Sequence, residues 1–182
     1  AAELAEGHDA IALEAQILVA VLLRDRSQID QAGALLDRIE ARLAALPHGG
    51  GVTAVRAMRA RADWLESKNR HTESRPMYDA VIAKAIGIQG SDSLIAARTR
   101  ISAAWSRATT DDVAGTSRYL EAGLEVLRRL GHEHRIEAAL LTATFARYRS
   151  RGLQIPYSEA LAAIAAARAE IAATGRPVVS EV

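Results

Sequence analysis

The sequence predicts an all-α protein, built as an α-solenoid of about four antiparallel helix hairpins. The 182-residue chain is 49% hydrophobic but only 4% aromatic, so its apolar surface is mostly Ala, Leu, Ile and Val. Alanine has the highest helix propensity, and apolar residues recur at helical spacing along most of the chain. Glycines expected to end helices recur at intervals of 42, 41, 41 and 44 residues: Gly7, Gly49, Gly90, Gly131 and Gly175. A fixed period that holds two helices is typical of a solenoid.

The first hairpin is expected within residues 8–49. Gly7 is predicted to end a short preceding helix, and a new helix should run from about residue 9 to residue 24. Its apolar residues at helical spacing are Ile11, Ala15, Leu18 and Leu22. After a turn in which Ser27 acts as the cap, the second helix should bury one stripe. That stripe consists of Ala32, Leu35, Leu36, Ile39 and Leu43.

The second hairpin is expected within residues 50–90. One face of its first helix carries Val55, Met58, Ala62 and Leu65. Thr72 should cap the partner helix, with Pro76 in the first turn, where a missing N–H costs little. The apolar face of that helix holds Met77, Val81, Ile82 and Ala85. Gly87 and Gly90 are predicted to end it.

The third and fourth hairpins are expected within residues 91–131 and 132–175. The third should bury Ile95, Ile101, Ala104 and Ala108, then Leu120, Leu124, Leu127 and Leu130, around a turn at residues 109–112. The fourth should bury Ile136, Leu140, Phe145 and Tyr148, then Ala160, Leu161, Ile164 and Ile171, around a turn at Gly152. Residues 176–182 are expected to form a loose tail.

The stretch from Asn69 to Tyr78, Asn-Arg-His-Thr-Glu-Ser-Arg-Pro-Met-Tyr, carries a resemblance to a known family. It resembles the long tetratricopeptide repeat (TPR) of about 42 residues found in kinesin light chains and bacterial signalling proteins. In that family a turn precedes a helix with Ala and then Pro-Leu-Tyr, and Ser74 stands here at the usual Ala. Leu130-Gly131-His132 matches the repeat ending of the family. The resemblance implies a curved right-handed superhelix, and HEAT-like helix pairs are the structural alternative.

Composition excludes several classes of protein. The chain has 23 basic and 22 acidic residues, and a dedicated nucleic-acid surface needs a clustered basic excess. The absence of cysteine excludes disulfides and thiolate chemistry. The longest uncharged apolar run, residues 15–23, is far shorter than the roughly 20 residues of a membrane span, so no membrane insertion is predicted. We expect a cytoplasmic location, or a periplasmic one if the chain is attached to a membrane-spanning regulator.

No motif in the sequence predicts catalysis, a cofactor or a metal site. His132-Glu133-His134 places two histidines on diverging directions of a helix, without a third ligand at useful spacing. The glycine run at residues 49–51 lacks the Gly-Lys-Ser/Thr ending of a phosphate loop and follows a helix instead of a strand. Asp111, Asp112 and Asp25 are interpreted as caps in turns.

A basic cluster is expected at the corner between the third and fourth hairpins. Its members are Arg128, Arg129, His132, His134 and Arg135. Contact with nucleic acid or anionic lipid is one interpretation of this cluster. Acidic residues close by in the sequence favour a solvated edge instead, and no direct nucleic-acid contact is predicted. These residues are Glu121, Glu125 and Glu133.

A polar stripe on the first helix of the second hairpin predicts a binding surface. Its members, at helical spacing, are Arg56, Arg59, Asp63 and Glu66. One repeat further along, Arg59 leads to Arg100 and Glu66 leads to Arg107. The TPR resemblance implies that first helices line a concave groove, where the planar fork of arginine suits carboxylates, so these six residues are predicted to line a partner-binding groove. The alternative is a set of ordinary ion pairs within one helix, such as Arg59 with Asp63. Trp64 and Trp105 are interpreted as packing residues, and the alternative is that they anchor a ligand in the groove.

These features together predict a non-catalytic module that binds a protein or a peptide. The TPR resemblance implies a sensor or regulatory domain of a larger bacterial signalling protein, either a transcriptional regulator or a Ser/Thr kinase. Because the sequence has no initiator Met, we expect residues 1–182 to be one repeat domain excised from such a protein. The alternative is a structural scaffold or self-association domain without a dedicated ligand, and a homodimer is one form it could take.

Overall fold

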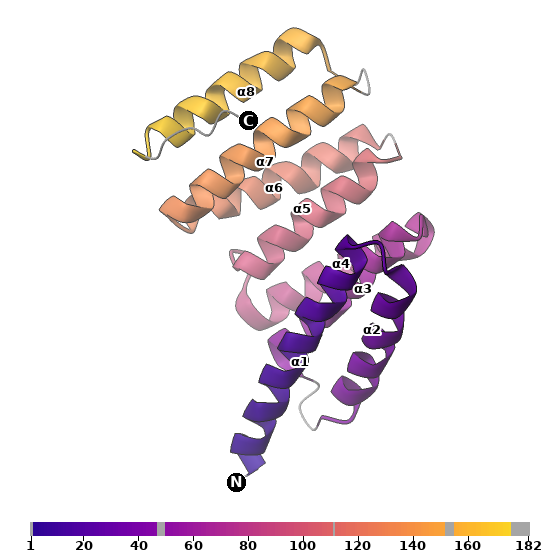
Figure 1. Ribbon diagram of the computed structural model, residues 1–182. Helices are drawn as coiled ribbons and strands as arrows, with labels where there is room; N and C mark the ends of the chain where they lie inside the picture. The colour runs from indigo at the N-terminus through magenta and orange to yellow at the C-terminus, as the bar shows by residue number, and fades with distance from the viewer. Residues whose placement is uncertain (1, 47–49, 111, 152–154, 176–182) are drawn as a thin grey trace.

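The computed structural model describes residues 2–46, 50–110, 112–151 and 155–175. These ranges contain eight α-helices and no strand, which confirms the all-α prediction (Figure 1). The helices are α1 (Ala2–Asp25), α2 (Ile29–Ala44), α3 (Gly51–Ser67), α4 (His71–Gln89), α5 (Leu94–Ala108), α6 (Val113–Arg129), α7 (His132–Arg151) and α8 (Tyr157–Ala172). They pair in chain order into four hairpins, α1–α2, α3–α4, α5–α6 and α7–α8.

The hairpins stack one after another along the chain. Each second helix packs on the first helix of the next hairpin, through the pairs α2 with α3, α4 with α5, and α6 with α7. Figure 1 shows α1 and α8 at opposite ends of this stack, so the array is not a closed bundle. The stepwise stacking confirms the predicted solenoid.

The stack is tighter on one side than on the other. Contacts join the first helices of the first three hairpins, α1 with α3 and α3 with α5. Within the described ranges, no comparable contact joins α2 to α4 or α4 to α6. The array therefore curves toward the side formed by α1, α3, α5 and α7, which we call the inner face.

The hydrophobic core lies mostly between hairpins. One buried cluster joins Ile17 of α1, Ile39 of α2 and Ala57 of α3. Another joins Ile101 of α5, Leu127 of α6 and Phe145 of α7. Because each cluster draws on three consecutive helices, a hairpin completes its core only with its neighbour, as expected for repeat proteins.

Burial follows the predicted stripes in the middle of the array. All five predicted residues of α2 are buried, as are the four of α5: Ala32, Leu35, Leu36, Ile39, Leu43, Ile95, Ile101, Ala104 and Ala108. The last two helices differ from the prediction, because Leu140, Tyr148 and Leu161 are exposed. Apart from Phe145, small residues take the buried positions of α7, since they allow close approach to α6 and α8: Ala138, Ala139, Ala143 and Ala146.

The apolar stripe predicted for α1 faces outward. Ile11, Leu18 and Leu22 are 71%, 63% and 57% exposed, while the buried positions are Leu13, Ile17 and Ala20. Helical spacing identifies residues that share a face, but it does not identify which face a neighbour covers. α1 packs on α2 and α3 only, so its opposite face has no covering helix among the described residues.

Several predicted helix boundaries are wrong. α1 runs through Gly7, and α4 runs through Gly87 and ends at Gly90, which has a left-handed φ of +85°. A glycine inside a helix costs only about 1 kcal/mol relative to alanine, which the flanking helix formers offset. The predicted ends at Gly49, Gly152 and the tail at 176–182 lie outside the described residues, as does Asp111.

Two turns between paired helices share one geometry in place of the predicted caps. Ser27 and Asn69, 42 residues apart, have left-handed φ values of +61° and +57°. The next residues, Gln28 and Arg70, are the N-caps of α2 and α4, so neither Ser27 nor Thr72 caps a helix. In contrast, Asp112 caps α6 as predicted, because its Oδ1 accepts a hydrogen bond of 2.9 Å from the Gly115 amide.

Gly123 marks a close approach of α5 and α6. A Cβ at this position would lie 2.8 Å from Ile101 Cγ1 and 2.9 Å from the Ala97 carbonyl oxygen, and a backbone atom cannot move away cheaply. We therefore expect Gly123→Ala to lower the free energy of unfolding by about 1–3 kcal/mol, measured by urea denaturation.

Gly87 supplies the matched control, because a Cβ there would meet nothing within 4 Å. Gly87→Ala should raise the free energy of unfolding by about 0.5–1 kcal/mol through helix propensity alone. Equal effects of the two substitutions would contradict the packing described for α5 and α6.

Candidate functional site

The predicted stripe on α3 lies partly in a hollow on the inner face. Arg59, Asp63 and Glu66 line this hollow of about 360 Å³, which we call the first hollow. Neighbouring helices complete its lining with Arg24, Ser67, Tyr78, Ser102 and Trp105. The structure therefore brings three of the six predicted groove residues together.

Asp63 forms ion pairs with both arginines that line the first hollow. Its Oδ2 lies 3.1 Å from Arg24 Nη1 and 3.9 Å from Arg59 Nε. The Tyr78 hydroxyl donates a hydrogen bond of 2.7 Å to Oδ1, and burial together with the carboxylate raises the pKa of that hydroxyl. The ion pair Arg59–Asp63, expected under the alternative interpretation, thus exists within a network that joins α1, α3 and α4.

Glu66 is a hydrogen-bond acceptor shared by three helices. Its Oε2 accepts hydrogen bonds from Ser74 Oγ at 2.6 Å and from Ser106 Oγ at 2.8 Å. Its Oε1 lies 2.7 Å from Nδ1 of His71. Burial opposes ionisation of this carboxyl, but the two serine hydroxyls and His71 outweigh burial and lower the pKa of Glu66. Both oxygens are therefore engaged within the protein.

The other predicted groove residues have partners elsewhere. Arg56 Nη1 lies 2.7 Å from Glu14 Oε2 and links α3 to α1. Arg100 Nη1 donates a hydrogen bond of 2.9 Å to the Ser91 carbonyl oxygen. Neither residue lines the first hollow.

Arg107 is buried between α4, α5 and α6. Its Nη2 lies 3.3 Å from Asp79 Oδ1, and its Nε lies 3.7 Å from Asp112 Oδ2. The guanidinium carbon is 4.2 Å from the ring centroid of Tyr119, a cation–π geometry. Only 7% of Arg107 is exposed, so in this structure the residue joins helices within the repeat.

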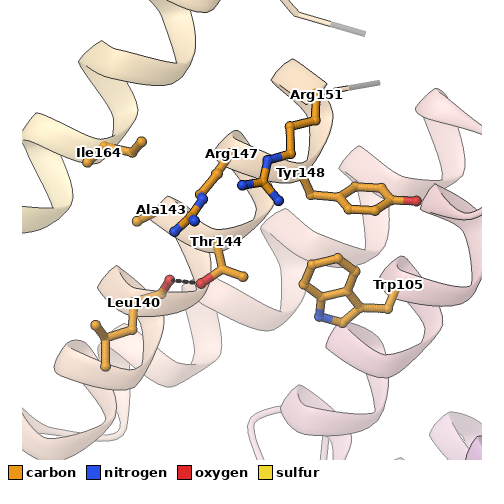
Figure 2. Close-up of a pocket in the computed structure, with 8 residues that line it drawn as sticks. All are labelled: Trp105, Leu140, Ala143, Thr144, Arg147, Tyr148, Arg151 and Ile164. Atoms are coloured by element: carbon orange, nitrogen blue, oxygen red, sulfur yellow. Dashed lines mark hydrogen bonds between the residues drawn. The ribbon is translucent and has the colours of Figure 1, made fainter. Parts of the chain in front are cut away.

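A second hollow of about 400 Å³ lies between α5, α7 and α8 (Figure 2). Its lining consists of Trp105, Leu140, Ala143, Thr144, Arg147, Tyr148, Arg151 and Ile164. Trp105 belongs to both hollows and separates them. Its ring stacks on Phe145 at a centroid distance of 3.9 Å and meets Tyr148 edge-on at 5.3 Å.

Sequence reasoning missed the second hollow because it assigned Leu140 and Tyr148 to the core. A signal was nevertheless present. Three arginines end α7, at positions 147, 149 and 151, and no acidic residue occurs between Glu137 and Glu159. A cationic segment without neighbouring acids indicates a surface that a partner could neutralise.

No family model and no curated protein matches the sequence. Among solved structures, the chain is similar to the crystal structure of a putative kinesin light chain of Podospora anserina with nearly identical TPR-like repeats. The TM-score is 0.71 at 16% sequence identity, over 95% of this chain and 80% of that chain. The chain has the TPR-like repeat fold. At this identity the similarity establishes the fold alone.

The two tryptophans occupy related places in this TPR-like array but have different neighbours. Trp64 Nε1 donates a hydrogen bond of 2.7 Å to the Ile29 carbonyl oxygen of α2, and the guanidinium of Arg61 lies 5.0 Å from its ring centroid. Trp105 instead packs against α7 and borders both hollows. Trp64 is thus a packing residue, and Trp105 also forms part of the inner surface.

The corner between the third and fourth TPR-like hairpins carries no ion-binding arrangement among the described residues. Within the described ranges there is no group of three or more His, Cys, Asp or Glu side chains that could hold a metal. The His132 side chain lies outside the described residues. His134 Nδ1 lies 3.3 Å from Glu137 Oε2, and both carboxylate oxygens of Glu137 accept hydrogen bonds of 2.9 Å from Arg98.

None of the described helices combines the length and the apolar composition that a membrane crossing requires.

Glu66 gives a testable dependence of stability on pH. Because its pKa is lower in the folded chain than the ordinary value of 4.5, ionised Glu66 stabilises the folded state above that value. This contribution is lost as the pH falls through the folded-state pKa. We expect Glu66→Gln to lower the free energy of unfolding by about 1–3 kcal/mol at pH 7 and to flatten its decline at acid pH.

Denaturant titrations at pH 7 and at acid pH measure both effects. Glu121→Gln is the matched control, since Glu121 is an exposed carboxylate on α6. If the two substitutions cost the same at pH 7, Glu66 does not join the helices as described.

Proposed function

We propose that this chain is a non-catalytic module that binds a protein or an extended peptide along its inner face. The observation that carries the proposal is the pair of adjacent hollows that share Trp105, because together they extend from α1 to α8. Solenoid curvature creates extended concave surfaces of this kind, which repeat proteins use for binding.

The size and chemistry of the hollows suit peptide side chains. Volumes of about 360 and 400 Å³ lie within the range of ligand pockets, and an extended ligand would place side chains on both sides of Trp105. Tryptophan and arginine are among the residues enriched in binding hot spots. Arg56 and Arg59 have side chains that are 54% and 31% exposed, so they retain hydrogen-bond donors for a ligand.

The polar groups of the first hollow support a binding role over catalysis. A general base needs a free lone pair aimed at a substrate. Asp63 and Glu66 instead accept hydrogen bonds from Tyr78, Ser74 and Ser106 within the protein. Their arrangement favours recognition by shape and hydrogen bonding.

We further propose that this module is the sensor or regulatory domain of a larger cytoplasmic bacterial signalling protein, a transcriptional regulator or a Ser/Thr kinase. The support is the resemblance of residues 69–78 to the long TPRs of such proteins. In this proposal residues 1–182 form one repeat domain, and the groove includes Arg56, Arg59, Asp63 and Glu66.

A second candidate function, self-association, is favoured by the exposed stripe of α1. Leu18 and Leu22 precede Ala60 and Trp64 by 42 residues each. Ala60 and Trp64 are among the residues through which α3 packs against the cluster containing α2. The exposed face of α1 therefore corresponds to a surface that stacks on another helix elsewhere in the array, and a second copy could cover it.

Peptide selection tests the binding proposal even though the partner is unidentified. We expect a random peptide library displayed on phage to yield binders whose affinity falls at least about tenfold, or 1.4 kcal/mol, for Trp105→Leu and for Arg59→Gln. Arg38→Gln is the matched control, because Arg38 is exposed on α2, away from both hollows.

Circular dichroism confirms that each variant is folded before its affinity is compared. A library that yields no binder, or binders that all three variants retain equally, would reject the inner face as a binding surface.

Light scattering distinguishes the binding module from the self-associating scaffold. We expect a mass near the 19.5 kDa of one chain, unchanged by the double substitution Leu18→Ser and Leu22→Ser. A larger mass that returns to that of one chain in the double variant would instead support self-association through α1.

A further inference from the structure

We propose that the second hollow binds an acidic peptide segment that carries an apolar side chain. This inference rests on the proposed function of the inner face and assigns a ligand chemistry to one part of it. It is carried by the combination of two arginines, unpaired among the described residues, with an aromatic and aliphatic lining.

The two arginines of the second hollow have no counter-charge among the described residues. Figure 2 shows the guanidinium groups of Arg147 and Arg151 in the space between Ile164 of α8 and Trp105 of α5. Of the described residues that line the hollow, none carries a carboxylate. Neither arginine forms an ion pair or a hydrogen bond with any described residue. Two like charges that face one hollow raise its positive potential, which a bound carboxylate would neutralise.

Other arginines on the first helices are paired with carboxylates. Arg24 lies 3.1 Å from Asp63, Arg56 lies 2.7 Å from Glu14, and Arg98 lies 2.9 Å from Glu137. The sequence thus supplies acidic partners for these arginines and omits them at the end of α7. The donors of Arg147 and Arg151 remain available for a ligand, with a fork geometry that matches a carboxylate.

The rest of the lining requires an apolar group. Leu140 and Tyr148 are large hydrophobic residues that are 39% and 37% exposed at the hollow. Trp105, Ala143 and Ile164 extend this surface. Inorganic phosphate would satisfy the arginines and leave the apolar lining in water, whereas a neutral peptide would leave the arginines unpaired. An acidic segment with one apolar side chain satisfies both halves of the site.

The test uses three defined probes and the whole 182-residue chain. The first probe is the end-blocked pentapeptide Glu-Asp-Leu-Asp-Glu, the second is its uncharged counterpart Gln-Asn-Leu-Asn-Gln, and the third is inorganic phosphate. The chain has two tryptophans, whose indole N–H resonances are resolved by two-dimensional NMR and assigned with Trp105→Phe. We expect the acidic peptide to shift the Trp105 indole resonance. The Trp64 resonance should stay in place, because the Trp64 indole N–H donates a hydrogen bond to the Ile29 carbonyl oxygen.

A pair of charge-matched variants identifies the arginines. Arg147→Gln with Arg151→Gln should weaken binding of the acidic peptide at least about tenfold, as expected for lost charge-assisted hydrogen bonds. Arg26→Gln with Arg38→Gln removes the same charge from exposed positions outside the hollow, and should change the affinity less than about twofold. Urea denaturation confirms that both double variants are folded.

Three results would overturn the proposed ligand chemistry. They are equal binding of the neutral peptide, an equal shift of the Trp105 resonance by phosphate alone, and an equal loss of affinity in the two double variants. Acidic-peptide shifts confined to the backbone amides around Arg59 would also overturn the site, while leaving the inner face as a binding surface. Failure of the inner face as a whole is detected separately, by the library selection.

Discussion

The structure depends on hydrophobic burial between hairpins, because each of the first three hairpins shares a buried cluster with a helix of the next hairpin. Ile39 of α2 shares a buried cluster with Ala57 of α3, and Leu127 of α6 shares one with Phe145 of α7. Polar contacts then fix how neighbouring hairpins align. Buried Arg61 of α3 donates a hydrogen bond of 2.8 Å to Glu40 of α2. A charged pair in this position contributes mainly to register, since burial offsets much of its attraction.

The fold was predictable because the same information occurs several times in the sequence. The glycines at positions 90 and 131 that end the second helices have positive φ values of +85° and +127°, so their spacing reflects a real geometric need. Gly7 and Gly87 are also glycines, but they lie inside helices and do not need a positive φ, because glycine adopts helical φ at small cost. The exposed stripe of α1 shows the other limit, since a periodic pattern cannot reveal that an end helix has one neighbour fewer.

The candidate site was less predictable, because spacing places side chains on a face without naming their partners. The Glu66 carboxylate accepts hydrogen bonds from the hydroxyls of Ser74 and Ser106, which lie 8 and 40 residues away in the sequence. The extrapolation to Arg107 used an interval of 41 residues, the distance between the ends of α3 and α5. The N-caps of the second helices recur at 42 instead, and one residue of difference rotates a side chain by about 100° around the helix axis.

The two halves of the inner face differ in whether their arginines are paired with carboxylates. In the first hollow a charged ligand would have to replace the existing pairs of Asp63 with Arg24 and Arg59, and it would gain little. Under the proposal for the second hollow, Arg147 and Arg151 offer a ligand no such competing pairs among the described residues, so charge recognition would belong to the C-terminal half. Trp105 lies between the halves, and its stacking on Phe145 joins α5 to α7. A ligand that occupies both hollows would therefore hold the third and fourth hairpins at one angle, which is how a binding event could become a change in the shape of the array.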